Sequence, residues 1–294
     1  MREVNALSID VEDYFQVAAL APAVPRSSWA QRESRVERST DSLLQLLDDH
    51  GIRATFFVLG WIALHHSGLV KRIAGAGHEI ASHGFSHQLI YTQSPDEFRQ
   101  ETRHSKELLE DLAGGAVIGY RAASFSITRR SLWALDVLLD LGFHYDSSVF
   151  PIHHDRYGIP GAAEEPGRVM APSGRTLVEF PMAAASFGGA RIPVSGGGYF
   201  RLLPYSLIRR GLLQINERKR RPFVFYLHPW EIDPDQPRLR VGWLSRFRHY
   251  TNLDRCEERL QQLLNDFEFA PVADVLRMHG LLVPSPNVAA ALAH

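Results

Sequence analysis

The stretch Ala6-Leu7-Ser8-Ile9-Asp10-Val11-Glu12-Asp13 decides the fold, because an apolar run changes within a few residues into a run of acids. The apolar part, which begins at residue 4, is typical of a buried strand. If the strand continues, alternation places Ser8, Asp10 and Glu12 on one face, so that two carboxylates point to the same place. Acids grouped in this way are also common in a charged loop after a strand. The stretch therefore predicts a strand and leaves the role of its acids open.

Six further apolar runs have the same form, and helical patterns separate most of them. They lie at residues 54–59, 78–81, 116–120, 143–145, 177–180 and 223–227. Alternating strands and helices predict parallel β/α units, and so an α/β protein.

The clearest helix is predicted to begin after Ser94-Pro95-Asp96-Glu97, where Ser94 can cap the first turn and Glu97 can reach back to it. Gly114-Gly115 ends this helix. Two further helices are predicted at 41–50 and 129–141. The region 151–204 is richer in glycine and proline and predicts long loops with short strands, which could wall a substrate groove.

Composition excludes several classes of protein. The 294 residues carry a formal net charge of -1, so no broad basic field draws nucleic acid or anionic lipid. Cys256 is the only cysteine, so the chain has no internal disulfide framework. No run approaches the roughly 18 apolar residues of a membrane helix, and the amino terminus leads straight into the first strand without room for a signal peptide. We therefore expect a cytoplasmic protein without a membrane span.

The segment His83-Gly84-Phe85-Ser86-His87 carries the most specific chemistry. Two neutral imidazoles four residues apart can close on one metal ion, and a carboxylate from another strand can complete the site. The spacing alone favours two surface histidines. Gly84, which lets the loop turn, together with Ser82 and His78 as supporting partners, shifts the balance to a metal site.

Three other residues stand where predicted strands end. Asp10 could accept a proton from water while a neighbouring acid holds the metal. His228 follows the run 223–227 and precedes Pro229; it is either functional or a satisfied histidine at a strand end. Arg121 could hold Asp10 in a bidentate pair, or form a surface salt bridge.

Aromatic residues near the strand ends have two interpretations. They could line a sugar-binding groove, although such residues more often belong to the core. The residues concerned are Trp61, Phe150 and Trp230.

Taken together, these motifs resemble the polysaccharide deacetylase superfamily (carbohydrate esterase family four), which contains nodulation-factor, chitin and peptidoglycan deacetylases. The resemblance runs from about residue 4 to about residue 275. Its motifs are 10–13, His83 with His87, 119–123, 145–148 and 226–228. More narrowly, 10–17 and 196–201 are similar to a subgroup linked with exopolysaccharide loci of the exosortase type.

This resemblance implies a distorted, incomplete (β/α) barrel of about seven parallel strands. It implies a catalytic domain at 1–283, followed by a loosely ordered tail at 284–294. One divalent metal is implied, zinc first, with nickel or cobalt as alternatives. The implied substrate is an N-acetylated amino sugar of a bacterial polysaccharide or its precursor, and the oligomeric state stays open.

Residue by residue, the resemblance implies that Asp10 is the general base and that Arg121 orients it. His83 and His87 match the metal ligands, and His228 matches the general acid. Asp146 lies in a matching segment and receives no role.

Three departures from the family pattern matter. Val11 stands where the family commonly has a second aspartate, so the acidic metal ligand moves to Glu12 or Asp13, of which Glu12 is preferred because it shares the face of Asp10. Ala123 replaces a common proline. Val149-Phe150 replaces an aspartate and a tryptophan, so whatever tunes His228 comes from elsewhere.

Two other functions remain open at this stage. Relatives with the same fold hydrolyse small cyclic amides such as allantoin. The altered motifs are also compatible with a carbohydrate-binding protein that has lost catalysis.

Overall fold

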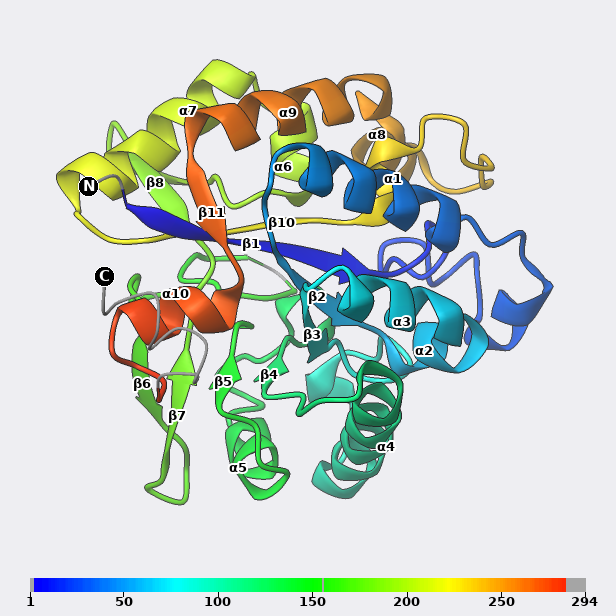
Figure 1. The fold of residues 1–294 in the computed structure, drawn as a ribbon, viewed down its shortest axis with the longest axis horizontal. Coiled ribbons are helices and arrows are strands. Elements are labelled where there is room, and N and C mark those ends of the chain that lie inside the picture. Colours follow the sequence, from blue (N-terminus) through cyan, green and yellow to red (C-terminus); the bar gives the residue numbers. More distant parts are fainter. Residues whose placement is uncertain (1–2, 155, 284–294) are drawn as a thin grey trace.

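The computed structural model describes residues 3–154 and 156–283, so the predicted tail 284–294 lies outside the described residues. Seven parallel strands form its centre in the order β10-β1-β2-β3-β4-β5-β7 (Figure 1). They are β1 (Val4–Val11), β2 (Thr55–Val58), β3 (Glu79–Ser82), β4 (Gly119–Tyr120), β5 (Tyr145–Asp146), β7 (Thr176–Glu179) and β10 (Val224–Leu227). All seven apolar runs in the sequence are confirmed as strands.

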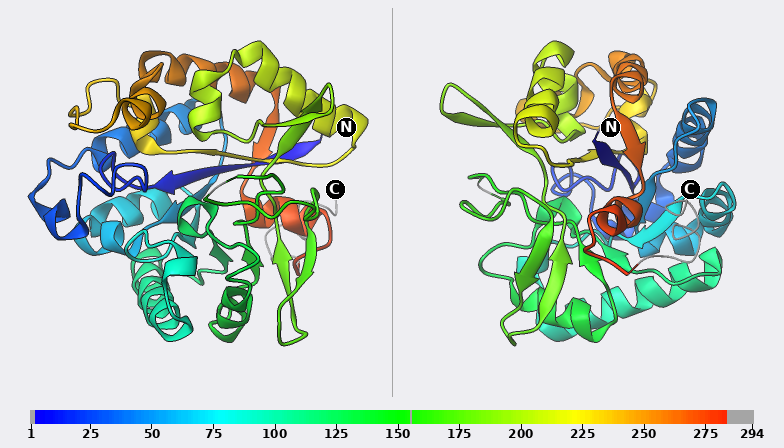
Figure 2. Two further views of the ribbon diagram at one scale, coloured as in Figure 1. Left: turned by 180° about the vertical axis from the view of Figure 1, so that it is seen from behind. Right: turned by 60° about the vertical axis from the view of Figure 1, so that its left-hand side comes forward.

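Four further strands lie outside the seven apolar runs, and three of them fall in the region 151–204 that was predicted to hold short strands. β6 (Gly167–Met170) pairs antiparallel with β7, and β11 (Glu268–Ala270) pairs parallel with the first residues of β1. β8 (Ala184–Phe187) and β9 (Ala190–Pro193) form a separate hairpin that projects from the body of the protein (Figure 2). These strands are partly exposed, so their residues lack the continuous apolar run that marks a buried parallel strand.

The segment after β7 closes the sheet on itself by returning to β10. Met182 forms a bridge with Val224, and Gly196 forms a second one with Tyr226. A Cβ atom on Gly196 would lie 1.9 Å from the Tyr226 carbonyl oxygen, and the φ of Gly196 is 125°, so only glycine fits this approach. The expected distorted barrel is therefore confirmed, with an irregular seam formed by isolated bridges.

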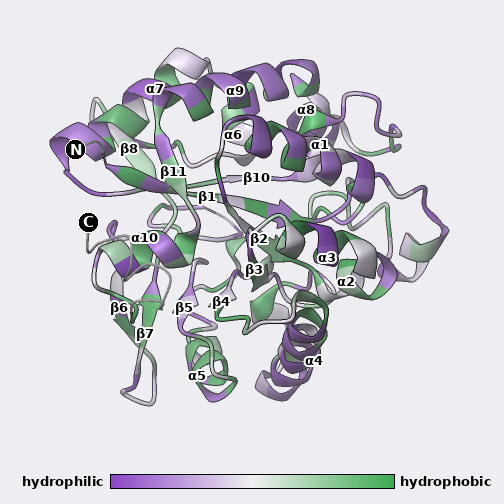
Figure 3. Cartoon of the chain, viewed as in Figure 1, coloured by the Kyte–Doolittle hydropathy of each residue, from purple (hydrophilic) through white to green (hydrophobic). Residues whose placement is uncertain are grey.

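Helices cover the outside of the barrel. The α-helices are α1 (Val36–Asp49), α2 (Gly60–His65), α3 (Ser67–Gly75), α4 (Pro95–Ala113), α5 (Trp133–Asp140), α6 (Gly197–Leu202), α7 (Tyr205–Leu213), α8 (Trp243–Tyr250), α9 (Cys256–Asp266) and α10 (Val272–Met278). Short 3-10 or π turns are η1 (Arg26–Gln31), η2 (Ile90–Thr92), η3 (Ala123–Phe125), η4 (Gln214–Arg218), η5 (Pro229–Ile232) and η6 (Leu253–Arg255). Figure 3 shows that α4 is largely hydrophilic and α5 largely hydrophobic. Of the described helices, none combines the length and the apolar character that crossing a membrane would need.

The predicted capping box of α4 is confirmed. Ser94 Oγ accepts from the Glu97 backbone N–H at 3.3 Å, and Glu97 Oε2 accepts from the Ser94 backbone N–H at 2.7 Å. Gly114 ends the helix with a φ of 69°. A local sequence signal was sufficient here because all of the capping partners lie within one turn.

The other two predicted helices differ at their first turns. α1 begins at Val36 rather than at residue 41, because a carboxylate from a distant loop caps it. α5 begins at Trp133 rather than at residue 129, because Thr128 donates its backbone N–H to Ser131 Oγ at 3.0 Å and forms a turn instead.

Candidate functional site

The side chains singled out in the sequence meet at the carboxyl ends of the barrel strands. Glu12 follows β1, His83 follows β3, Arg121 follows β4 and His228 follows β10. Parallel strands end at the same edge of a barrel, which is where α/β barrels place their reactive groups.

Glu12, His83 and His87 form a buried cluster whose ligand atoms all lie within 4.8 Å of one another. Glu12 Oε2 lies 2.9 Å from His87 Nε2. The two atoms are close enough to share one proton or one cation. A tetrahedral zinc site with ligand distances of about 2.0–2.2 Å separates its ligand atoms by about 3.3–3.6 Å. The three residues therefore fit a small divalent cation.

The loop between the histidines is fixed from several sides. His83 Nδ1 donates to the Arg121 carbonyl at 2.8 Å, which leaves Nε2 free to bind a cation. Gly84 has a φ of 74° and donates its N–H to Ser82 Oγ at 3.2 Å, so the predicted turn and the supporting role of Ser82 are both seen. His87 itself adopts a φ of 52°, a strained value for a residue with a side chain.

Burial and charge favour the ligand forms of these groups. Burial lowers the pKa of His83 to about 4, so its ring is neutral at neutral pH. Burial opposes ionisation of Glu12, but the neighbouring His87, His228 and His83 outweigh it and lower the pKa of Glu12 to about 2. A neutral imidazole and an ionised carboxylate are the forms that bind a metal.

Asp13 faces away from the cluster. Its Oδ1 accepts from the Tyr14 N–H at 2.9 Å, and its Oδ2 accepts from Ser34 Oγ at 2.7 Å and from the backbone N–H groups of Arg35 at 2.9 Å and Val36 at 3.2 Å. Of the two acids that the sequence left open, the structure brings Glu12 to the histidines and uses Asp13 to cap α1. The placement of Asp13 among the metal ligands therefore does not fit this geometry.

His78 was expected beside the histidine loop, and this expectation is wrong. It precedes β3 whereas His83 follows it, so the two residues lie at opposite ends of the strand. Its Nδ1 accepts from the Ala54 backbone N–H at 3.1 Å, which is a structural role.

Asp10 and Arg121 form a buried ion pair. Arg121 Nη1 donates to Asp10 Oδ1 at 2.7 Å and to Ser8 Oγ at 2.7 Å. The pair is not bidentate as expected, because Arg121 Nε and Nη2 donate instead to the carbonyl and the hydroxyl of Ser147 at 3.1 Å and 3.0 Å. The guanidinium also lies 4.1 Å from the centre of the Phe57 ring. Arg121 is thus fully held, and it keeps a positive charge against Asp10.

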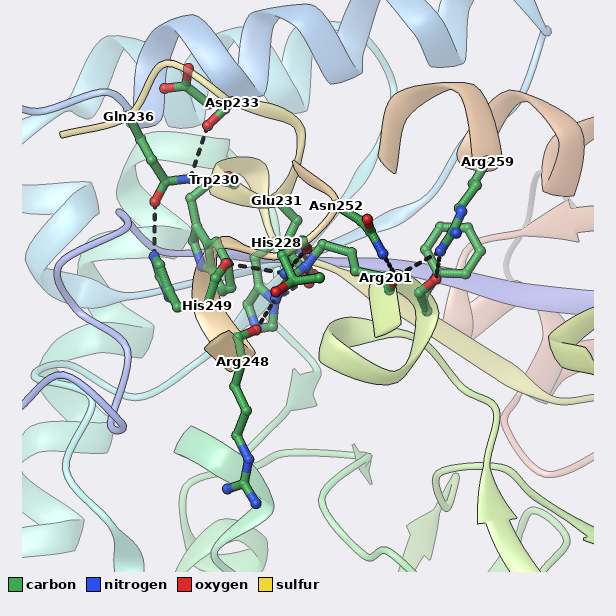
Figure 4. A network of polar contacts seen from close by, with 12 residues as sticks. Arg201, His228, Trp230, Glu231, Asp233, Gln236, Arg248, His249, Asn252 and Arg259 are labelled. Atoms are coloured by element: carbon green, nitrogen blue, oxygen red, sulfur yellow. Dashed lines mark hydrogen bonds and ion pairs between the residues drawn. The ribbon is translucent and has the colours of Figure 1, made fainter. Parts of the chain in front are cut away.

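His228 is paired with an acid that the sequence analysis did not single out. Its Nδ1 lies 2.9 Å from Glu231 Oε2 (Figure 4). Its Nε2 faces Glu12 Oε1 at 3.5 Å. Its ring stacks on Trp230, with 5.1 Å between the ring centres. Burial would lower the pKa of His228, but the hydrogen bond and charge of Glu231, together with the charges of Glu12 and Asp10, raise it to about 9. His228 can therefore carry a proton at neutral pH.

Glu231 is in turn held by Arg201. Arg201 Nε donates to Glu231 Oε1 at 2.7 Å, and both side chains are buried. Burial opposes ionisation of Glu231, but Arg201 and His228 lower its pKa to about 2. Two features of the sequence could have pointed to this arrangement: an acid stands three residues after His228, and an arginine ends the 196–201 motif. Nothing in either segment shows that the two meet.

Asp146 lies outside the metal cluster and faces Glu179 on the next strand. Both carboxyls are buried, and Asp146 Oδ2 and Glu179 Oε2 receive no hydrogen bond from other groups. Burial raises the pKa of Asp146 to about 6, and burial with the charge of Asp146 raises that of Glu179 well above its usual value. A proton shared between the two carboxyls satisfies both oxygens.

Of the three aromatic residues that the sequence left open between groove and core, two are buried. Phe150 and Trp230 are buried, and Trp230 donates its Nε1–H to Glu12 Oε1 at 3.3 Å from beneath the site. Trp61 packs edge-on against Trp29, with 5.5 Å between ring centres. A cavity of about 300 Å³ lies beside His87, and Trp29 is among its lining residues. This cavity therefore reaches His87, a residue of the metal cluster.

Comparison with known proteins finds two family models that match parts of the chain. Residues 31–145, less than half of the chain, match the family model of polysaccharide deacetylases. This segment is therefore similar to the polysaccharide deacetylases. Residues 147–277 match a second model, a domain of unknown function named DUF3473. His83, His87 and Arg121 lie in the deacetylase match and His228 in the second, while Asp10 and Glu12 precede both.

Curated relatives of the deacetylase domain are similar over short segments. A peptidoglycan-N-acetylglucosamine deacetylase of Bacillus cereus is 40% identical over 77 residues, which is 26% of this chain and 28% of that protein. A peptidoglycan deacetylase of Helicobacter pylori is 33% identical over 113 residues, 38% of this chain and 37% of that one. A chitooligosaccharide deacetylase of Rhizobium leguminosarum bv. trifolii is 29% identical over 99 residues, 34% and 43% of the two chains. The matches thus span less than half of each relative.

Solved structures similar to the whole chain confirm the fold. A Mycobacterium smegmatis protein described as a polysaccharide deacetylase superposes with a TM-score of 0.63 at 21% identity, over 96% of this chain and 94% of that one. The Puue allantoinase superposes with a TM-score of 0.58 at 16% identity, over 94% and 89% of the two chains. The two matched segments, 31–145 and 147–277, therefore belong to one barrel.

Proposed function

We propose that this protein is a metal-dependent hydrolase that removes N-acetyl groups from amino sugars of a bacterial polysaccharide or its precursor. The observation that carries the proposal is the convergence of Glu12, His83 and His87 on one point, with Asp10 and His228 beside it. The match of residues 31–145 to the polysaccharide deacetylases supports the same reaction.

We assign Glu12, His83 and His87 to the metal. Two imidazoles and one carboxylate are donors that suit zinc, and nickel or cobalt would accept the same set. When bound, such a cation supplies positive charge that polarises the acetyl carbonyl and lowers the pKa of a water molecule.

Asp10 is the residue that we assign as the general base. Arg121 holds one of its oxygens at 2.7 Å and thereby fixes the carboxylate, while within the described residues Oδ2 receives no hydrogen bond. That oxygen is free to take a proton from the attacking water. The water oxygen then bonds to the acetyl carbon.

His228 is assigned to the opposite task, protonation of the leaving nitrogen as the C–N bond breaks. Its pKa of about 9 keeps a proton on the ring at neutral pH, and the contact of Nδ1 with Glu231 leaves Nε2 pointing towards Glu12. The products are acetate and a free amino sugar.

The cavity beside His87 is the place that we propose for part of the sugar chain. Its volume of about 300 Å³ and its lining by Phe15 and Trp29 suit a sugar ring, since such rings pack on aromatic faces. An exopolysaccharide as the polymer and a cytoplasmic location remain predictions from the sequence.

The direct test measures acetate release from N-acetylglucosamine oligomers with zinc present. We expect turnover in the unchanged protein and none above background in His83→Ala. His144 is exposed and lies away from the site, so His144→Ala is the matched control and is expected to retain turnover. Equal turnover in both variants would refute the metal role.

The same preparations separate the two alternatives. Hydrolysis of allantoin without acetate release from oligomers would favour a cyclic amidase. Glycan affinity that survives removal of zinc, without any turnover, would favour a binding protein. The likeness to an allantoinase is one of fold, so it does not favour either outcome.

A further inference from the structure

Helix α8 exposes an unusual number of large apolar side chains. Trp243 is 79% exposed, Leu244 43% and Phe247 52%. Among the described residues, seven large apolar side chains are exposed, and these three lie within five positions of one another. Positions i, i+1 and i+4 of a helix share one side, so the three side chains form one patch.

Arginines surround this patch without acidic partners. Arg240, Arg246 and Arg248 are exposed, and none of the ion pairs among the described residues involves them. The segment 237–250 contains four arginines and no aspartate or glutamate. The overall net charge of -1 conceals this local excess. In Figure 4 the guanidinium of Arg248 points away from the buried network around His228.

The backbone beneath the patch is firmly held, so the surface is already formed. Arg201 donates to the carbonyl oxygens of Arg248 at 2.9 Å and His249 at 3.1 Å. The His249 ring stacks on Trp230 at 4.2 Å between ring centres, and Trp230 stacks on His228. The patch is therefore connected rigidly to the catalytic edge of the barrel.

A cavity of about 690 Å³ lies between α8 and the loop at 19–23. Arg238, Arg240 and Arg246 line it together with apolar side chains such as Leu20 and Leu239. An open hollow lined by both arginines and apolar side chains suits an amphiphile that has an anionic head.

We propose that Trp243, Leu244 and Phe247, with Arg240, Arg246 and Arg248, form a docking surface for an anionic phospholipid bilayer, here called the α8 surface. Exposed Trp, Leu and Phe insert at the boundary between head groups and acyl chains, while arginines bind lipid phosphates. A protein partner would have to supply several acids as well as an apolar face, whereas an anionic bilayer supplies both everywhere. The proposal does not depend on the chemistry assigned to the metal cluster.

Vesicle sedimentation tests the α8 surface with the whole protein. We expect sedimentation with vesicles that contain phosphatidylglycerol, none with phosphatidylcholine alone, and weakening at high salt. Arg246→Gln/Arg248→Gln is expected to weaken binding by about 25-fold, since each basic side chain near an anionic surface contributes about fivefold. Trp243→Ser/Phe247→Ser should also reduce binding and remove the blue shift of tryptophan fluorescence that vesicles cause.

The matched control is Arg168→Gln/Met170→Ser on β6, which removes an exposed arginine and a 72% exposed methionine far from α8. All of these side chains are exposed, so the variants should fold, as far-UV circular dichroism can verify. Absence of sedimentation at low salt, or equal binding by α8 and β6 variants, overturns the proposal. So does equal binding to soluble dextran sulfate without a fluorescence shift, or a dimer that Trp243→Ser/Phe247→Ser dissolves.

Discussion

Replacing Glu231 by glutamine is expected to slow acetate release while leaving the metal bound. The carboxylate accepts hydrogen bonds from Arg201 Nε at 2.7 Å, from the His228 backbone N–H at 3.1 Å and from His228 Nδ1 at 2.9 Å. A glutamine has one oxygen and one NH₂ group, so it cannot accept from Arg201 and from His228 on separate oxygens. Either the ring of His228 loses its partner or Arg201 does.

The size of the effect follows from the role assigned to His228. Loss of a positioned general acid costs about a hundredfold to ten-thousandfold in rate. This corresponds to about 3–5 kcal/mol in the activation barrier, since a tenfold change is about 1.4 kcal/mol. Breaking the buried Arg201–Glu231 pair is also expected to lower the free energy of unfolding by about 3 kcal/mol.

The assay measures kcat, KM and bound zinc for Glu231→Gln, with thermal unfolding measured in parallel. We expect kcat to fall, with KM and zinc content close to those of the unchanged protein, because Glu231 is not in the metal cluster. Glu257→Gln, an exposed acid on α9, is the control. If kcat does not change in Glu231→Gln, or falls only in proportion to the folded fraction, then Glu231 does not position a general acid.

The remaining predictions concern the acids and the metal. Glu12→Gln should abolish zinc binding with little loss of stability. Asp13→Asn should keep zinc but lower the free energy of unfolding by about 2 kcal/mol, because Asp13 caps α1. Zinc analysis and denaturant unfolding measure the two effects, and loss of zinc in Asp13→Asn would reverse the assignment. Glu179→Gln should stabilise the protein at neutral pH by about 2 kcal/mol. The pKa of Asp146 is raised to about 6, so the folded state holds extra protons and its stability falls as the pH rises from about 4 through 6. In the variant, the free energy of unfolding measured against pH should change less over this range. Chelation should remove activity and zinc should restore it. The zinc affinity should fall as the pH is lowered towards about 4, the pKa of His83, because protons then compete for its ring; zinc affinity that stays constant through this range would contradict ligation by His83.

The sequence was sufficient for the barrel because its central strands are buried on both faces. All four residues of β2 and of β10 are buried, which is why they read as continuous apolar runs. The partly exposed β6, β8, β9 and β11 carry no such run. The seam at Gly196 could not be predicted either, because the approach of Tyr226 depends on the closed barrel.

The candidate site was predictable where its signal was local. His83, Gly84 and His87 lie within one loop, and the spacing of the histidines, together with Gly84 and Ser82, predicted a pair of imidazoles at one metal site. The choice between Glu12 and Asp13 depended instead on where α1 begins, which alternation along the strand could favour but not decide. The sequence does not show that Asp13 contacts the first turn of α1, and this contact separates the two acids.

The errors arose where closeness in the sequence and closeness in the fold differ. Ser147 occupies the nitrogens of Arg121 that a bidentate pair would have used. His78 is close to His83 in sequence but at the other end of β3. Glu231 gained its role from Arg201 on a different helix, and no pattern within either segment showed that contact.

The central claim is that one divalent cation binds between two imidazoles and one carboxylate. An anomalous difference map from crystals grown with zinc, measured at the zinc absorption edge, tests it most directly. We predict one strong peak about 2.0–2.2 Å from Glu12 Oε2, His83 Nε2 and His87 Nε2. A peak bound by Asp13, or no peak among these three residues, would contradict it.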